Sequence, residues 1–506
     1  MKKSIIPPIA VLLGALLFNL FFWNEKQGLN ILLFDIFIVT TLWQLDKEPF
    51  LTPSVKITVG GTLLTALLVV WHNSLLVKLI HILSFFTMIG MIQQRELRFL
   101  GFAILQYFSN WFAVPVRLVH QLNAILILRG QNNVAKRLNG IWLTLLIMPV
   151  FYLIYFVANA KFAELSSQFW HQLLPFLTFD IDIDRVLFFS LGIFIVGATV
   201  WQQRWIDLSQ KDAAFQETLS PPESGENNSL IYRNALNLIV ALNILLLINN
   251  LIDIRYVWFG DVNGKTALEL KQYVHEGTYV LIYGILLAIL VILWLFRDSL
   301  NFIDEARKKP ILLRGVTTVW LVQNAVLALS VGIRNGQYIN HYGLAYKRIG
   351  VFVFLTLTLY GLWLLYLKIK EKRTFFSFIC HSSYAIYAVL MATCLINWDV
   401  FITKFNINVP AKSGSIDVRF LVNDVSDKNL YLLFSNVEHL ATKMPSKPFP
   451  DSEYRYETMS FANDAERLAY LKILLNNKKT TFEAEQKMYS WLSWNYADYV
   501  NQQFFK

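Results

Sequence analysis

The sequence predicts an all-α integral membrane protein with about eleven transmembrane helices. Hydrophobic residues make up 55% of the chain and charged residues only 16%, whereas soluble globular chains carry about 25% charged residues. The mean hydropathy over the 506 residues is +0.44. Long apolar runs alternate with short loops rich in Lys and Arg, which is the pattern that membrane insertion imposes. A single large soluble domain is therefore excluded.

The apolar runs are close to the ~17–25 residues that a helix needs to cross a bilayer. We place them at 4–23, 28–45, 55–71, 74–92, 139–159, 185–202, 231–252, 277–296, 312–333, 349–367 and 376–397. The first run follows Lys2 and Lys3 as a signal peptide would, but no small-residue cleavage site follows it. We therefore interpret it as an uncleaved span.

The basic residues predict the orientation of the chain in the membrane. If the spans simply alternate, the basic loops at 93–137, 297–314 and 368–373 fall on one side. The positive-inside rule makes that side cytoplasmic, so the N-terminus is expected inside and the C-terminus outside. The net charge of +10 is then explained by membrane insertion, and we expect no nucleic-acid partner.

Composition divides the chain into segments. We expect four spans in 1–92, amphipathic helices at the cytoplasmic interface in 93–138, spans five and six in 139–203, a flexible cytoplasmic linker in 204–230, a five-span domain in 231–402 and an extracytoplasmic, mainly helical domain in 403–506.

Three of these assignments depend on particular residues. Residues 97–114 are apolar but contain Arg98, and Pro115 follows, so we expect two amphipathic helices in the inner interface over residues 93–137; if the first one spans, every later loop changes side. Residues 216–229 are polar and rich in Pro and Ser, as linkers are. Residues 464–475 and 482–500 have helical spacing of apolar residues and predict two helices.

Polar side chains inside the spans have two interpretations. Asn243, Gln323 and Asn324 interrupt apolar runs, and such groups hydrogen-bond between helices; the alternative is a polar pathway. His81 and Lys78 lie in the fourth span. We expect a hydrogen-bonded histidine and a lysine that extends to the interface.

Three polar clusters at the outer ends of the last spans form the candidate site. Ionisable groups at membrane edges are costly to place and are therefore functional candidates. The predicted topology places all of them on one face. The residues are His275, Glu276, Arg334, Tyr338, Tyr342, Arg348, Asn397 and Asp399.

The chemistry of this candidate site is that of an ion-pair cluster or an anion clamp. Arg334 or Arg348 can pair with Glu276 or Asp399, or bind a phosphate or carboxylate. His275 titrates near neutral pH when unperturbed. The structural alternative is that these pairs only lock the loops, since charged and aromatic residues gather at helix ends in any case.

The clusters resemble a family of bacterial multi-pass inner-membrane proteins that carry a domain of unknown function, family 4173, which is related to family 4153. The family pattern is Tyr-x-Arg-Glu-Gly-Phe, then Arg-x-x-x-Tyr-x-x-x-Tyr-Gly-Leu-Thr-x-x-Arg, then Asn-x-Asp-x-x-Ile-x-x-x-Asn. This chain departs from it at His275, Thr278 and Ala345. The strong part covers residues 230–420, and Gly28-Leu29-Asn30 resembles an N-terminal element. The resemblance implies the bacterial inner membrane and brings no catalytic residues.

Motifs for common enzymatic chemistry are missing from the sequence. It has no Walker-type loop, no H-E-x-x-H and no G-x-S-x-G, so we expect no cofactor, no metal and, on balance, no enzyme. We expect a protein that binds a small anionic or lipid-like ligand at its outer face, with membrane lipids as partners. The alternatives are an accessory or sensory subunit that binds another membrane or envelope protein through its C-terminal domain, and a membrane-embedded transferase that uses His275 and Glu276.

Overall fold

The structure is a computed structural model of the whole chain. It describes residues 2–128, 144, 148, 151–152, 154–173, 182–201, 207–221, 229–259, 267–297, 300–302, 312–409, 411–444, 461 and 463–506. Within these ranges the chain is helical and contains no β-strand, apart from one isolated bridge between Thr218 and Arg373. The expected all-α fold is confirmed for this part of the chain.

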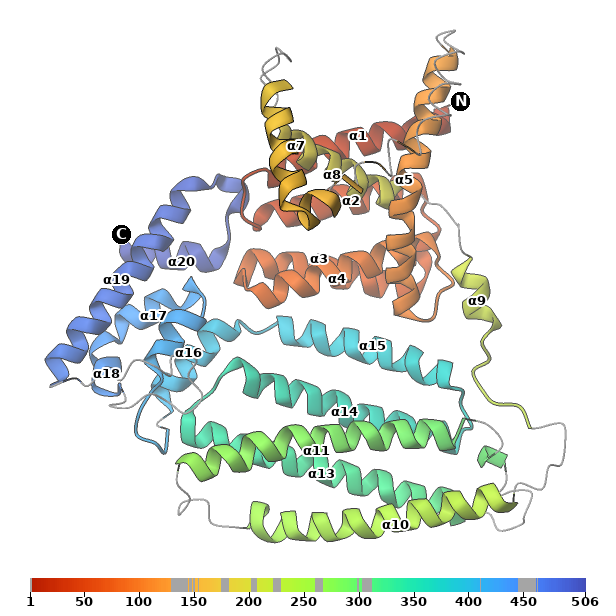
Figure 1. Cartoon of the computed structure of the whole chain (residues 1–506), viewed down its shortest axis with the longest axis vertical. Coiled ribbons are helices and arrows are strands. Elements are labelled where there is room, and N and C mark those ends of the chain that lie inside the picture. The colour runs from red at the N-terminus through yellow and green to blue at the C-terminus, as the bar shows by residue number, and fades with distance from the viewer. Residues whose placement is uncertain are drawn as a thin grey trace.

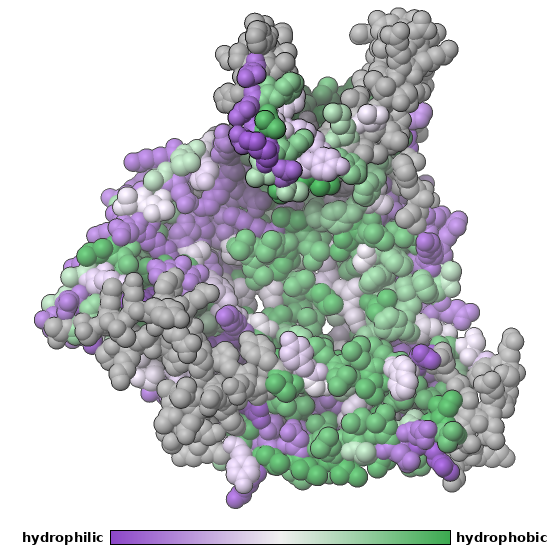
Figure 2. Space-filling view, in the orientation of Figure 1, coloured by the Kyte–Doolittle hydropathy of each residue, from purple (hydrophilic) through white to green (hydrophobic). Residues whose placement is uncertain are grey.

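Six helices in the described ranges are long and apolar enough to cross a membrane. They are α3 (Pro53–His72), α4 (Leu75–Gln93), α10 (Ser229–Asp253) with the π-helical turn Ile254–Trp258, α13 (Leu312–Tyr342), α14 (Tyr346–Lys370) and α15 (Phe375–Cys394). Shorter apolar segments lie in α1 (Lys2–Phe22), α2 (Leu29–Leu45) and α11 (Ala267–Leu295). These helices run alongside one another (Figure 1), and apolar side chains form a broad band over them on the face shown in Figure 2.

Two expected spans, at 139–159 and 185–202, are not among the helices named above. The run at 185–202 corresponds to helix α8 (Ile183–Val200). The run at 139–159 lies mostly outside the described residues, and helix α7 (Ala160–Leu173) follows it. The total of eleven spans and the orientation of the chain stay predictions.

The first bundle contains α1, α2, α3, α4, α8 and the helix that follows α4, α5 (Leu100–Leu128). Close helix crossings and a tight hairpin hold it together. A Cβ atom on Gly90 of α4 would lie 1.8 Å from the Ala103 carbonyl oxygen of the next helix, so only glycine allows this backbone approach. Between α3 and α4, Asn73 adopts a left-handed φ of 53° and ends α3, while the Ser74 side chain accepts a hydrogen bond from the Val77 N–H and caps α4.

Within the described part of the segment 93–138, which ends at Leu128, the structure has one helix, α5 (Leu100–Leu128), where two amphipathic helices were expected. Pro115 lies inside it, because losing one backbone hydrogen bond does not end a helix that packs on its neighbours. Tyr107 and Val114 are buried, whereas Phe112 is 74% exposed. In Figure 1, α5 runs across the direction of α3 and α4 at the end where α9 (Leu208–Ala214) lies. Its position at the cytoplasmic interface stays a prediction.

The second bundle contains α10, α11, α13 and α14, and its polar side chains connect helices. The Gln323 amide donates to the Asn243 side-chain oxygen at 2.7 Å, and the Asn250 amide donates to the Gln323 carbonyl at 3.0 Å. Hydrogen bonds between helices are therefore confirmed for Asn243 and Gln323, whereas the Asn324 amide donates to the Trp320 carbonyl of its own helix at 2.8 Å. Helix α15 lies between the two bundles (Figure 1), and its Tyr387 hydroxyl is 2.7 Å from the Ser84 hydroxyl of α4.

The segment expected as a flexible linker is docked over part of its length. Asp212 of α9 is fully buried and accepts hydrogen bonds from the Arg98 side chain at 2.7 Å and the Arg98 N–H at 2.9 Å. The Leu219 N–H donates to the Lys372 carbonyl at 2.8 Å. Sequence composition did not indicate these contacts, which involve distant loops; residues 222–228 lie outside the described ranges.

The C-terminal elements form a separate helical layer at one end of the bundles (Figure 1). They are α16 (Trp398–Asn408), the turns Phe420–Asp424 and Asp427–Asn429, α17 (Leu430–Ser435), α18 (Val437–Thr442), α19 (Asp464–Met488), the turn Trp491–Ser493 and α20 (Tyr496–Phe505). Leu421, Leu433 and Leu471 are fully buried in a core that also contains Ile339 of α13 and Leu344. The expected break between residues 475 and 482 is wrong, because α19 continues to Met488.

Candidate functional site

Of the two arginines among the expected site residues, Arg334 is the more deeply buried. Its guanidinium, near the end of α13, forms an ion pair with Asp253 at the end of α10. The side chains are 9% and 5% exposed. Asp253 was not an expected partner, because a sequence does not reveal that the ends of α10 and α13 meet. His275 and Glu276 lie on α11, and their side chains are outside the described residues.

Tyr338, Tyr342 and Arg348 come together at the turn between α13 and α14. The two tyrosine rings lie 4.7 Å apart, and the Arg348 guanidinium lies 4.5 Å from the centre of the Tyr338 ring. Arg348 also donates to the Gly343 carbonyl. A cation over an aromatic ring is attracted to its face, so these side chains hold the first turn of α14 against the end of α13.

The motif residue Asn406 holds the same turn from α16. Its side-chain oxygen accepts from the Leu344 N–H at 2.6 Å, and its amide donates to the Leu344 carbonyl at 2.9 Å. Gly343 has a φ of +82°, and a Cβ there would lie 2.5 Å from the Asn406 oxygen. The motif therefore requires glycine for conformation and for space, which gives Gly343, Leu344 and Asn406 a structural role.

Asn397 and Asp399 begin α16. The Asn397 side chain caps the helix by accepting from the Val400 N–H at 3.3 Å. Asp399 is 5% exposed and accepts from the Tyr346 hydroxyl at 2.6 Å and from the Ser426 hydroxyl. The expected site residues thus contact Asp253, Tyr346 and Ser426, which were not among them. One shared site for all eight residues stays a prediction.

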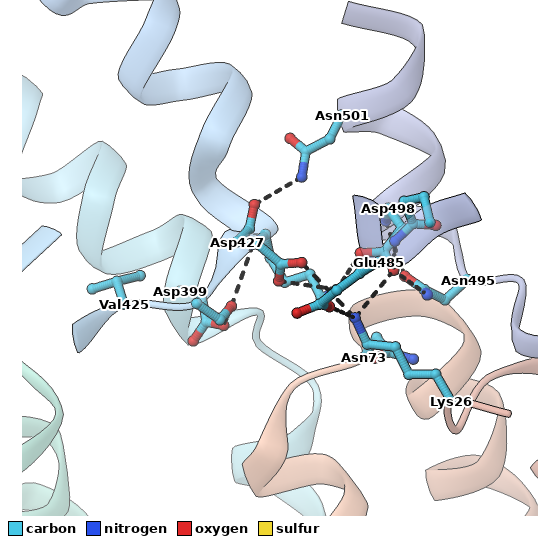
Figure 3. Close-up of polar contacts among 12 residues, drawn as sticks. Lys26, Asn73, Asp399, Val425, Asp427, Glu485, Asn495, Asp498 and Asn501 are labelled. Carbon is cyan, nitrogen blue, oxygen red and sulfur yellow. Dashed lines mark hydrogen bonds and ion pairs between the residues drawn. The ribbon is translucent and has the colours of Figure 1, made fainter. Parts of the chain in front are cut away.

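A second charged cluster, absent from the expectations, joins the α1–α2 connection to the C-terminal elements (Figure 3). The Lys26 ammonium lies 3.9 Å from Asp427, 3.5 Å from Glu485 and 3.8 Å from Asp498. Lys428, whose side chain is 2% exposed, pairs with Asp427 at 3.2 Å and with Asp498. We call these five residues the Lys26 cluster.

The charges of this cluster shift its pKa values. Burial alone raises the pKa of the Asp498 carboxyl, but Lys428 and Lys26 outweigh burial and hold that pKa below its usual value. Burial lowers the pKa of Lys26, but the carboxylates of Asp498, Asp427 and Glu485 outweigh it and raise that pKa. Both groups are therefore stabilised in their charged forms.

The same connection is also fixed by hydrogen bonds to backbone groups. The Ser490 N–H donates to the Glu25 carboxylate at 3.1 Å, and the Leu29 N–H donates to the Trp494 carbonyl at 3.0 Å. Asn30 accepts from the Gly28 N–H at 2.7 Å and donates to the Phe21 carbonyl at 2.8 Å. The Gly28-Leu29-Asn30 element therefore shapes the turn on which the C-terminal segment rests.

A cavity of about 440 Å³ opens among α1, α2, α4, α5 and α8, next to this connection. Eight of its fifteen lining residues are Phe, Tyr or Trp. Its lining also contains Asp35, which is 2% exposed, and His81, which is 5% exposed. His81 Nε2 lies 3.7 Å from Asp35 Oδ2, and His81 Nδ1 lies 3.2 Å from the Thr65 hydroxyl. His81 is thus hydrogen-bonded, as expected, and it also faces a carboxylate.

The fold and these contacts define a helical membrane protein with several apolar spanning helices, whose polar clusters lie where the bundles meet the C-terminal elements. A family model described as a domain of unknown function, DUF4153, matches residues 58–433, about three-quarters of the chain. The chain belongs to this family. No curated protein and no solved structure matches it.

The family match extends well beyond the motif region. It starts in α3 and ends in α17, and so includes helices of both bundles. In the described part of the chain, no group of three or more His, Cys, Asp or Glu side chains is arranged to hold a metal ion. The buried free thiols Cys380 and Cys394 both lie in α15.

Proposed function

We propose that this protein binds a lipid-like molecule within the membrane, in the cavity between α1, α2, α4, α5 and α8. The cavity itself is the observation that carries the proposal. Its volume of about 440 Å³ falls in the range of ligand pockets, roughly 300–1,000 Å³, which are mostly apolar with a few polar groups. Tyr107 and Trp111 line it together with Asp35 and His81.

The residues of the candidate site expected from the sequence then have a supporting role. Arg334 is ion-paired with Asp253, and the Arg348 guanidinium lies over the Tyr338 ring. The Asn406 side chain hydrogen-bonds to the N–H and the carbonyl of Leu344. These contacts connect helix ends, and their loss would change the geometry of the bundle. We propose that they hold the second bundle and the C-terminal elements in place around the first bundle, which contains the cavity.

The proposed location is the bacterial inner membrane, with the N-terminus inside and the C-terminal elements outside. Support comes from the basic residues Arg95, Arg98 and Arg373, which lie in helix connections at the end opposite the C-terminal elements (Figure 1). The positive-inside rule makes that end cytoplasmic.

Glu25 and Gln27, in the connection between α1 and α2, line the cavity. In the proposed orientation this connection lies at the outer side, so the ligand would enter from the outer leaflet. A relation to family 4173 remains a proposal that rests on the motif resemblance.

Purification with native lipids tests this function. Protein extracted from its membrane is analysed by mass spectrometry for molecules that remain bound, and Ile195→Trp serves to narrow the cavity from α8. We expect the variant to lose most of the bound molecule. Leu191→Trp is the matched control, because Leu191 lies on the same helix, is 40% exposed and does not line the cavity. Equal retention by both variants would refute binding in the cavity.

A second candidate is an accessory subunit that binds a membrane or envelope protein through its C-terminal elements. Met488 is 72% exposed and Trp491 is 67% exposed, and exposed apolar side chains that lie together mark interaction surfaces. Cross-linking in native membranes from a photoreactive residue at position 488 distinguishes the candidates: a discrete protein adduct supports the subunit, and lipid adducts alone oppose it.

A further inference from the structure

The most unusual group in the cavity is the carboxylate of Asp35. It lies on α2, six residues after Leu29, and therefore about 9 Å along the helix at a rise of about 1.5 Å per residue. Its residue is 2% exposed, and no described group forms a hydrogen bond with Oδ2. Ionisable groups at such depth are costly and are usually functional.

The surroundings of Asp35 do not satisfy it. The His81 Nε2 lies 3.7 Å from Asp35 Oδ2, beyond the 2.7–3.2 Å of a normal hydrogen bond. Apart from this pair, Glu25 and Gln27, the lining consists of aromatic and isoleucine side chains. A buried polar oxygen without a donor costs free energy, and a ligand that supplies a donor would remove this cost.

The charges of the lining indicate which head group fits. Among the fifteen lining residues, Glu25 and Asp35 are the acidic ones, and none is Lys or Arg. Glu25 precedes α2, whereas Asp35 lies inside that helix. A phosphate or carboxylate head would meet two carboxylates in an apolar site, which is unfavourable. A head group that donates hydrogen bonds would meet Asp35 Oδ2, which has no donor among the described groups.

We propose that Asp35 is the polar anchor of this cavity and that the ligand is an apolar chain that carries a protonated amine. The inference rests on the proposed binding function and specifies its ligand class. The chain packs among Phe34, Phe85 and Tyr107, and the ammonium group donates to Asp35 Oδ2. His81, whose Nδ1 lies 3.2 Å from the Thr65 hydroxyl, lies beside this anchor without forming a hydrogen bond to Oδ2.

The test compares two probes of equal chain length on the purified full-length protein. Dodecylamine and dodecanoic acid are titrated by calorimetry, in a detergent in which each is soluble, with the wild type, Asp35→Asn and Ile195→Trp. We expect dodecylamine to bind the wild type at least about tenfold more tightly than dodecanoic acid. Asp35→Asn should weaken dodecylamine binding about tenfold or more, because hydrogen bonds to charged groups are worth at least this factor.

The outcomes separate the two proposals. If Ile195→Trp leaves the binding of both probes unchanged, the cavity is not the binding site and the proposed function fails. If Ile195→Trp weakens both probes but Asp35→Asn alters neither, cavity binding stands and the role of Asp35 is overturned. The wild-type comparison needs no folded variant: equal or tighter binding of dodecanoic acid overturns the amine preference by itself.

Discussion

At the scale of single residues, the ion pair between Arg334 and Asp253 should be the most sensitive contact of the second bundle. Arg334→Ala leaves the buried Asp253 carboxylate without this partner, and breaking a buried pair costs about 3–5 kcal/mol. We expect a large loss of folded protein, measured as the thermal midpoint in detergent. The double variant Arg334→Ala with Asp253→Asn should recover part of it. A stable Arg334→Ala protein would show that the pair is dispensable for folding.

The turn at Gly343 makes a second residue-scale prediction. Its φ is +82°, and a Cβ atom added there would lie 2.5 Å from the Asn406 oxygen, so a side chain cannot enter without rearrangement. We expect Gly343→Ala to destabilise the protein by about 1–3 kcal/mol, the usual cost of strained backbone. Gly336→Ala is the matched control, since a Cβ there meets no atom within 4 Å. Equal thermal midpoints for the two variants would contradict this interpretation.

At the scale of elements, the Lys26 cluster should make the attachment of α19 and α20 sensitive to acid. The pKa of Asp498 is held below its unfolded value of about 3.8. A lowered carboxyl pKa contributes stability that is present above the unfolded pKa and is lost as pH falls through the folded pKa. We expect hydrogen exchange in residues 489–505 to accelerate relative to α3 as pH falls below about 4.

The control for this experiment is Asp498→Asn. The variant lacks the titrating carboxyl, so its α20 should already be weakly attached near neutral pH and should show a smaller additional change in acid. An acid response of the same size in the variant and the wild type would assign the effect to other carboxylates.

At the scale of the whole molecule, the proposed orientation predicts which surfaces are reachable from outside the cell. The native thiols of Cys380 and Cys394 are buried, so they give little background labelling. Glu483→Cys on α19 should react with a membrane-impermeant maleimide on intact spheroplasts. Glu48→Cys, next to α3 and with a side chain 71% exposed, should react only after lysis. The reverse pattern would invert the topology.

The sequence by itself determined the class of this protein and much of its local structure. Apolar runs predict α3, α4, α10, α13, α14 and α15 because a helix that crosses a membrane must satisfy its own backbone. The helix break expected near residue 480 was wrong, since packing rather than intrinsic preference decides where α19 ends.

Only the tertiary structure decided which polar groups meet. Asp253 and Arg334 are 81 residues apart, and Glu25 and Ser493, which are hydrogen-bonded, are 468 residues apart. Periodicity identifies the face that a helix buries, but it does not identify the neighbour on that face. For the same reason the cavity around Asp35 could not be predicted: His81 and Tyr107 are ordinary residues within their own helices, and they line one cavity only because α2, α4 and α5 pack together.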